Sequence, residues 1–255
     1  MQPITGIKME KLCYSIGDRV ILQDFELFLE KGINRTILGV SGAGKTTILK
    51  LLLGLLPPDS GRIIINGVDL VGLSAQELIR VRKRTAIVFQ GGALFDSMTV
   101  GENVGYRLLE EGVLSEREIE RIICEKLSFV GLDDVMDLYP AELSGGMKKR
   151  VAIARALAAD PDYILFDEPT TGLDPIGVFN ICHLIVDLQK EGKTTLLVTH
   201  DLESAFKVSQ RFSFLHQSRL VFDGTREEML ASPLSEIREF LKPTDQSLFP
   251  HMSCA

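Results

Sequence analysis

The stretch Gly39-Val40-Ser41-Gly42-Ala43-Gly44-Lys45-Thr46-Thr47 decides the fold of this chain. Its first eight residues match the pattern G-x-x-x-x-G-K-[ST] of a phosphate-binding loop. Apolar runs at residues 33–40 and 48–56 flank it, which predicts the strand and the helix that such a loop joins. Glycines let backbone N–H groups close around phosphate oxygens, and the N-terminus of the helix adds a positive dipole. We therefore predict a nucleotide site over residues 39–47 rather than a chance glycine-rich turn. Lys45 should contact the outer phosphates, and Thr46 should bind Mg²⁺.

The composition excludes several classes of function. The 255 residues include 28 Lys and Arg against 35 Asp and Glu, which gives a net charge of −7. An acidic chain has no general electrostatic attraction to nucleic acid or to an anionic membrane surface. No apolar run approaches the roughly 20 residues that span a bilayer, and residues 1–10 lack the pattern of a secretory signal. We expect neither a transmembrane helix nor a nucleic-acid partner.

The cysteines and histidines are scattered without the spacing of a metal site. Since no export signal is seen, we expect the cysteines to be free thiols in a reducing cytosol. They are Cys13, Cys124, Cys182 and Cys254.

The distribution of apolar residues predicts an α/β fold. Strands expected at residues 7–14 and 20–29, with turn clusters after them, should form an N-terminal antiparallel sheet. Further on, expected strands alternate with expected helices, which is typical of a parallel sheet covered on both faces. The strands are expected at 85–89, 163–166, 194–199 and 212–215, and the helices at 74–84, 176–190 and 202–208.

One segment interrupts this alternation. Residues 99–160 are rich in Glu and Leu with helical periodicity, so we expect an inserted helical subdomain of about residues 91–158. The helix before it should begin at Ser74, because Glu77 has the spacing of a capping box. Residues 1–242 then form one domain, and residues 243–255 are expected to be a loose tail.

Two carboxylates, Asp167 and Glu168, end the strand expected at 163–166. The carboxyl ends of parallel strands open onto the ligand crevice of such sheets. Asp167 can therefore hold Mg²⁺, and Glu168 can polarise a water for attack on the terminal phosphate. Alternatively the pair only caps the following turn, which is the weaker interpretation downstream of a phosphate loop.

Polar residues also follow the neighbouring strands. His200 could contact the terminal phosphate, although a lone histidine is often structural, and Gln90 could reach the metal or the attacking water. The turn Leu143-Ser144-Gly145-Gly146-Met147 precedes an expected helix, and such a turn at a helix N-terminus is a second anion site. The chain thus has two candidate anion sites but one nucleotide reaction. This suggests that two copies of the chain meet and that each completes the nucleotide site of the other.

These elements, in this order, resemble the nucleotide-binding subunits of ABC transporters over residues 7–230. The corresponding motifs are Walker A (39–46), the Q-loop (Gln90), the signature (143–147), Walker B (163–167), the catalytic glutamate (Glu168), the D-loop (172–174) and the switch histidine (His200). The resemblance implies a P-loop ATPase that uses ATP and Mg²⁺, with Thr46, Gln90 and Asp167 near the metal. It also implies a head-to-tail dimer, with ATP between Walker A of one copy and Ser144, Gly145 and Gly146 of the other. A membrane permease would be moved through the Q-loop region.

Two positions depart from the pattern of the family. An aromatic residue often stacks on adenine near the N-terminus, and here Tyr14, Ile16 or neither could do so. The signature usually ends in Gln and here ends in Met147, which removes a possible polar contact but leaves the Ser-Gly-Gly turn.

Residues 80–104 resemble a narrower group within the family. The sequence Gly92-Ala93-Leu94-Phe95 is similar to ATPases of the maintenance-of-lipid-asymmetry type, which work with MCE-domain proteins and move phospholipids between bacterial membranes. This implies a location at the cytoplasmic face of the inner membrane, with an integral membrane permease and an MCE-domain lipid-binding protein as partners. Leu94 and Phe95 have little expected local packing, so we predict an apolar anchor for the permease there. The alternatives are an ATPase of an importer for amino acids or other small solutes and a soluble ABC ATPase without a permease.

Overall fold

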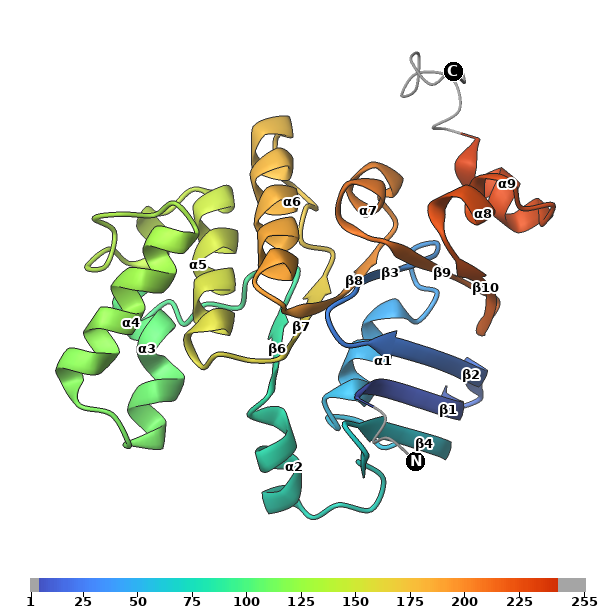
Figure 1. The fold of residues 1–255 in the computed structure, drawn as a ribbon, viewed down its shortest axis with the longest axis horizontal. Helices are drawn as coiled ribbons and strands as arrows, with labels where there is room; N and C mark the ends of the chain where they lie inside the picture. Colours follow the sequence, from blue (N-terminus) through green and yellow to red (C-terminus); the bar gives the residue numbers. More distant parts are fainter. Residues whose placement is uncertain (1–4, 243–255) are drawn as a thin grey trace.

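A six-stranded sheet lies at the centre of residues 5–242, which are the residues that the computed structural model describes. Its strand order is β10-β9-β3-β8-β7-β6 (Figure 1). The strands are β3 (Asn34–Leu38), β6 (Thr85–Val88), β7 (Tyr163–Asp167), β8 (Thr194–Thr199), β9 (Arg211–His216) and β10 (Arg219–Gly224). All except β10 are parallel, which confirms the predicted core and brings their carboxyl ends to one edge. The predicted tail, residues 243–255, lies outside the described residues.

Strand β10 is absent from the sequence-based expectation. It pairs antiparallel with β9 through a two-residue turn at Gln217 and Ser218, whose φ angles are 44° and 66°. Two successive positive φ angles are typical of a type I′ hairpin turn, which usually contains Asn-Gly or Asp-Gly. Gln-Ser carries no such signal, so the hairpin could not be recognised from its turn.

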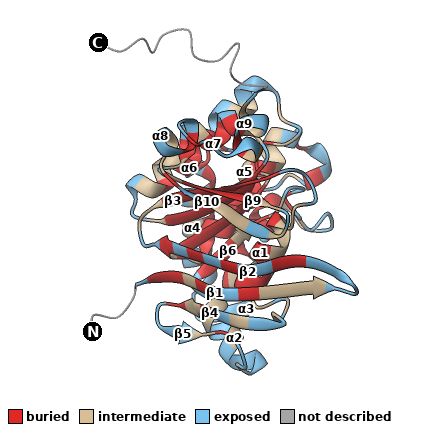
Figure 2. Cartoon of the chain, turned by 90° about the vertical axis from the view of Figure 1, so that its right-hand side faces the viewer, coloured by how far each residue is buried: buried red, intermediate tan, exposed pale blue. Residues whose placement is uncertain are grey.

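Both faces of the central sheet are covered, because successive side chains of its strands enter two separate cores. On β7, Tyr163 and Leu165 belong to a core that includes α1 (Lys45–Leu52) and the N-terminal strands. Ile164 and Phe166 belong to a core formed with the helices of residues 100–158 and 175–190. All four side chains are fully buried, and the middle of the molecule, where the central sheet lies, is largely red in Figure 2. Residues 163–166 are buried on both faces and apolar, which is why β7 was recognisable in the sequence.

The N-terminal strands form a second, antiparallel sheet, as predicted, with the order β2-β1-β4-β5. These strands are β1 (Gly6–Ile16), β2 (Arg19–Glu30), β4 (Ser60–Ile65) and β5 (Val68–Asp69). Register shifts between Met9 and Leu12 and between Leu12 and Tyr14 bend β1 against β2. Buried side chains of this sheet pack over α1, so the β1–β2 turn lies near the phosphate loop.

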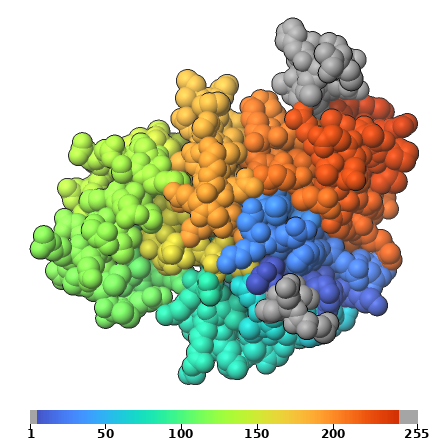
Figure 3. Space-filling model, viewed as in Figure 1, coloured from blue at the N-terminus to red at the C-terminus, as the bar shows by residue number. Residues whose placement is uncertain are grey.

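Helices fill the segment that was predicted to be helical. They are α3 (Val100–Glu111), α4 (Glu116–Phe129) and α5 (Gly145–Ala158), with a 3₁₀ turn at Pro140–Glu142. The three helices pack against one another at the left of Figure 1 and form the green and yellow part of Figure 3. Before them, α2 (Ala75–Arg82) begins at Ser74 with the predicted capping box to Glu77.

The remaining helices are α6 (Pro175–Lys190), α7 (Leu202–Val208), α8 (Arg226–Leu230) and α9 (Ser235–Leu241). The first two confirm the prediction. A small third core, with Leu38, Phe212, Phe214, Met229 and Ile237, joins α8 and α9 to the sheet. Three of the four cysteines are free thiols in the structure, and Cys254 lies outside the described part. Between residues 5 and 242, no helix is both long and apolar enough to cross a membrane.

Candidate nucleotide site

The phosphate loop joins β3 to α1, as predicted, and two of its glycines leave no room for a side chain. A Cβ on Gly39 would lie 2.7 Å from the carbonyl oxygen of Leu215, and one on Gly44 would lie 2.8 Å from Ile21 Cγ2. Gly44 also has a φ of 105°, which L-residues avoid. The glycine pattern therefore reflects the close approach of the loop to β9 and β2.

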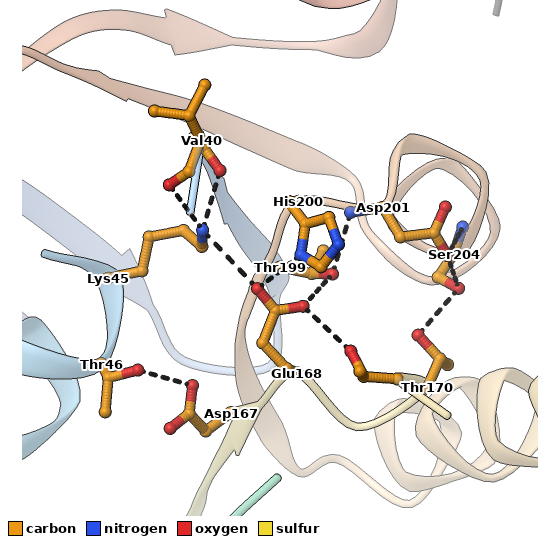
Figure 4. Close-up of polar contacts among 12 residues, drawn as sticks. Val40, Lys45, Thr46, Asp167, Glu168, Thr170, Thr199, His200, Asp201 and Ser204 are labelled. Atoms are coloured by element: carbon orange, nitrogen blue, oxygen red, sulfur yellow. Dashed lines mark hydrogen bonds and ion pairs between the residues drawn. The ribbon is translucent and has the colours of Figure 1, made fainter. Parts of the chain in front are cut away.

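Lys45 is buried at the first position of α1. Its ammonium donates hydrogen bonds to the carbonyl oxygens of Gly39 (2.7 Å) and Val40 (3.1 Å) and lies 3.5 Å from Glu168 Oε1 (Figure 4). Burial lowers the pKa of Lys45, and the carboxylates of Glu168 and Asp167 offset part of this effect. A desolvated cation inside a glycine-rich loop attracts an anion strongly, because the local dielectric constant is low.

Asp167 ends β7 beside the second residue of α1. Thr46 Oγ1 donates a hydrogen bond to Asp167 Oδ1 at 2.9 Å, and Asp167 is buried. Burial raises the pKa of Asp167, and the hydrogen bond from Thr46 opposes this shift. Hydroxyl and carboxylate oxygens are ligands that Mg²⁺ accepts, so the structure brings two of the three predicted metal-binding residues together. The third, Gln90, is exposed and lines the same pocket as Thr46.

Glu168 leaves the extended conformation of β7, since its φ is 46°. Its carboxylate accepts a hydrogen bond from Thr199 Oγ1 at 2.9 Å and lies 2.9 Å from His200 Nδ1 (Figure 4). The ends of β7 and β8 therefore bring the candidate base and the candidate phosphate-sensing histidine into contact. In favour of the turn-capping alternative, the Glu168 carboxylate accepts a longer contact from Thr171 Oγ1 of the following turn, at 3.5 Å.

A pocket of about 360 Å³ joins these groups. The predicted residues that line it are Ser41, Gly42, Gly44, Lys45, Thr46, Thr47, Gln90, Glu168 and His200. Two further lining residues, Arg19 and Ile21 of β2, were not predicted. Arg19 donates a hydrogen bond to the carbonyl oxygen of Gly42 at 3.3 Å. Nothing in the local sequence marks them, because only the packing of the N-terminal sheet brings β2 to the loop.

Several residues predicted to bind nucleotide are not among those lining this pocket. Val40 is 54% exposed, and Ala43 is partly buried and packs against the core around α1. Tyr14 packs against the same core and is half-buried. Ile16 is 59% exposed at the end of β1, where it is paired with Arg19.

The second predicted anion site lies at the start of α5. Ser144 is the N-cap of this helix, and its Oγ accepts a hydrogen bond from the backbone N–H of Met147 at 3.3 Å. Ser144, Gly145 and Gly146 border a pocket of about 330 Å³ together with residues 172–174. This pocket shares no lining residue with the pocket at the phosphate loop, so the two candidate anion sites of one chain are separate.

The expectation that Leu94 and Phe95 lack local packing is wrong. Leu94 packs against the core formed by α3 to α6. The Phe95 ring lies 4.9 Å from the Tyr106 ring and 5.8 Å from the guanidinium carbon of Arg155, yet Phe95 remains 43% exposed. The partners come from α3 and α5, whose approach could not be predicted from the segment itself.

Comparison with known proteins agrees with this geometry. The profile of the ABC transporter family matches residues 22–171. The chain is 41% identical over 237 residues to the intermembrane phospholipid transport system ATP-binding protein MlaF of Haemophilus influenzae, covering 92% of this chain and 90% of that protein. It is 37% identical to MlaF of Escherichia coli K12, with 92% and 88% covered. The probable ribonucleotide transport ATP-binding protein mkl of Mycobacterium tuberculosis H37Rv is 41% identical, with 92% of this chain and 66% of mkl covered.

Solved structures of the family have the same fold. A dimeric post-hydrolysis state of the ATP-binding cassette MJ0796, bound to ADP and Pi, matches with a TM-score of 0.79 at 32% identity, covering 86% of this chain and 98% of that one. The cbiO1 protein of Clostridium perfringens, part of the ABC transporter complex cbiONQ, matches with a TM-score of 0.81 at 31% identity, covering 95% and 96%. The profile match spans more than half of the chain and two relatives are similar over nearly their whole length. The chain therefore belongs to the ABC transporter family, as one of its ATP-binding and ATP-hydrolysing subunits.

Proposed function

We propose that this ATPase powers the movement of phospholipids between bacterial membranes. The observation that carries the proposal is the similarity to two MlaF proteins, at 41% and 37% identity over 92% of the chain. Both are named as ATP-binding proteins of an intermembrane phospholipid transport system. Because 90% and 88% of their lengths are covered, the similarity is not confined to the motifs that all ABC ATPases share.

The contacts of the candidate site support the following catalytic roles. Residues 39–47 bind the phosphates of ATP, and Lys45 turns from its own loop carbonyls to the outer phosphates. Glu168, held by Thr199 and His200, accepts a proton from the attacking water. His200 contacts the terminal phosphate and registers its loss. Gln90, which is exposed and lines the pocket, contacts the water or the metal.

The residues present fit a magnesium ion. Thr46 Oγ1 and Asp167 Oδ1 lie 2.9 Å apart, and Gln90 lines the same pocket as Thr46, so side chains with hard oxygen ligands are gathered where the phosphates would end. When bound, the ion would neutralise charge on the phosphates. For adenine, exposure favours Ile16 over Tyr14, because the Tyr14 side chain is engaged in the core and Ile16 is beside Arg19 at the pocket.

We infer a head-to-tail dimer from the separation of the two anion sites. Ser144, Gly145 and Gly146 form an anion site that the phosphate loop of the same chain does not share. A second copy can place its bound ATP there, as expected for a cassette whose solved relative MJ0796 is dimeric. ATP would then favour the closed dimer, because only there are both anion sites engaged.

The domain bounds and the partner contacts are proposed from the positions of the remaining segments around this site. We infer one ATPase domain over residues 1–242, with residues about 91–158 as a helical subdomain and residues 243–255 as a tail. Phe95, still 43% exposed between Tyr106 and Arg155, is the proposed contact for an integral membrane permease. An MCE-domain lipid-binding protein completes the transporter, and the ATPase lies at the cytoplasmic face of the inner membrane through its permease.

The second candidate function is that of a small-solute importer ATPase, favoured by the name of the mkl relative at the same 41% identity. Co-purification of the tagged chain from membranes, with mass spectrometry of partner proteins and bound lipids, separates the two. We expect a permease, an MCE-domain protein and bound phospholipid. Recovery of a solute-binding protein and a solute permease, without an MCE-domain protein, would reject the lipid proposal in favour of the importer.

A further inference from the structure

A second buried lysine contacts the candidate catalytic glutamate from the face opposite Lys45. Lys149 lies on α5 and is 7% exposed. Its ammonium donates a hydrogen bond to the backbone carbonyl oxygen of Glu168 at 3.3 Å. Burial lowers the pKa of Lys149, and the charges of Glu168 and Asp167 partly offset this. A lysine ammonium is seldom buried without a close carboxylate, which suggests that Lys149 has a functional role.

The Glu168 backbone requires support. A φ of 46° is unfavourable for a residue with a Cβ, and such strain persists only where the surroundings hold it. The backbone N–H of Glu168 donates to the carbonyl oxygen of Val198 at 2.9 Å, which ties it to β8. The carbonyl oxygen accepts from Lys149, which ties it to α5. The direction of the Glu168 side chain therefore depends on both neighbours.

Lys45 and Lys149 contact different groups of Glu168. Lys45 contacts the carboxylate of Glu168 and two carbonyls of the phosphate loop, so it is available to exchange these partners for phosphate. Lys149 contacts the backbone of Glu168 rather than its carboxylate, so it can stay in place when Lys45 turns away. Helices α1 and α5, which carry the two lysines, pack in the cores on opposite faces of β7.

We propose that Lys149 is a positioning residue that holds Glu168 in its left-handed conformation and links it to the Ser144 turn at the start of the same helix. Ser144 is the N-cap of α5, and Lys149 follows in the next turn. Helix α5 therefore has the candidate anion site at its N-terminus and, one turn later, the lysine that donates a hydrogen bond to Glu168. Binding of the second copy's ATP at Ser144 acts on Glu168 of the same chain through α5. The inference depends on the proposed role of Glu168.

The test compares Lys149→Met and Lys149→Arg with a matched control, Lys148→Met. The control removes the same charge from the adjacent position, where the structure gives no ion pair for Lys148 within residues 5–242. ATP turnover (kcat), KM, affinity for a fluorescent ATP analogue and thermal unfolding are measured on the full chain. We expect Lys149→Met to lower kcat about 10- to 100-fold, the range for losing a hydrogen bond from a charged donor.

The same variant should keep KM and analogue affinity within about twofold of wild type, because the phosphate loop is untouched. Its unfolding temperature should not fall, since a methionine of similar length removes a buried charge that lacks a close carboxylate. Lys149→Arg, which retains a cationic donor, should recover part of the lost kcat, and Lys148→Met should behave as wild type.

A kcat of Lys149→Met close to wild type would overturn the inference. So would a parallel loss of kcat, nucleotide affinity and thermal stability, because that is the result of a purely structural lysine. Glu168→Gln serves as the reference for the proposed function. If Glu168→Gln is inactive while Lys149→Met is active, only the inference about Lys149 fails. If Glu168→Gln is active, Glu168 is not the base, and both the proposed role of Glu168 and the inference about Lys149 fail.

Discussion

Replacing Glu168 with Gln tests the catalytic assignment most directly. The amide keeps the shape of the side chain but cannot accept the proton of the attacking water. Loss of a positioned general base typically costs about 10²–10⁴ in rate, or about 3–5 kcal/mol in the barrier. Binding of ATP should persist, because the phosphate loop and Lys45 are unchanged, so the variant should accumulate as an ATP-bound dimer.

The contacts of Glu168 indicate that the variant will fold. One side-chain oxygen can still accept from Thr199, and the amide can donate to His200 Nδ1 in the tautomer that accepts. Lys45 loses its ion pair at 3.5 Å but retains hydrogen bonds of 2.7 and 3.1 Å to two carbonyls. We therefore expect a stability loss of about 1–2 kcal/mol, less than the 3–5 kcal/mol for a buried charge left without partners.

The assay measures phosphate release at saturating ATP and Mg²⁺, together with the elution volume on size exclusion with and without ATP. EDTA in place of Mg²⁺ is the matched control for both proteins and should stop hydrolysis by the wild type. We expect slow or absent turnover and an ATP-dependent shift to a dimer that EDTA reverses. Turnover of the variant within about threefold of wild type would refute the reasoning, because Glu168 would then not be required to accept the proton.

Three further predictions concern the loop, the composite site and the partner. Gly44→Ala should lose about 2–5 kcal/mol of stability in urea unfolding, from the positive φ and the 2.8 Å approach of its Cβ to Ile21; a variant as stable as wild type would contradict the loop geometry. Ser144→Arg should abolish hydrolysis, and mixing it with Lys45→Ala should restore part of it, because each heterodimer contains one intact composite site; full activity of a monomeric Ser144→Arg chain would exclude the dimer. Phe95→Asp should release the ATPase from membranes in a flotation assay, with nucleotide affinity unchanged, because one buried aromatic anchor contributes about 1–3 kcal/mol to docking on the permease. Retention of the variant on membranes would show that Phe95 is not part of the interface.

Local sequence was sufficient where short-range chemistry decides the structure. The phosphate loop was recognisable because its glycines are required by the approach of β9 and β2, and its Lys and Thr are the residues expected to contact phosphate and metal. Strand β7 was recognisable because residues 163–166 are buried on both faces and apolar, and β8 because its buried residues are all aliphatic or β-branched. The polar residues Asp167, Glu168 and His200 then had to lie at the carboxyl edge of the sheet, where the structure brings them together.

Tertiary structure alone decided which distant side chains complete the site. Arg19 and Ile21 reach the phosphate loop only because the N-terminal sheet packs over α1, and no local pattern marks such an approach. Phe95 gained Tyr106 and Arg155 as neighbours from two other helices, and β10 formed through a turn without turn-type residues. Lys149 had the appearance of one more charged residue on a helix, and only the packing of α5 against β7 buries it beside Glu168. The order of motifs along the chain therefore determined the family and the chemistry. Contacts between different elements, such as Phe95 with Arg155 and Lys149 with Glu168, depend on packing free energies that no single segment contains.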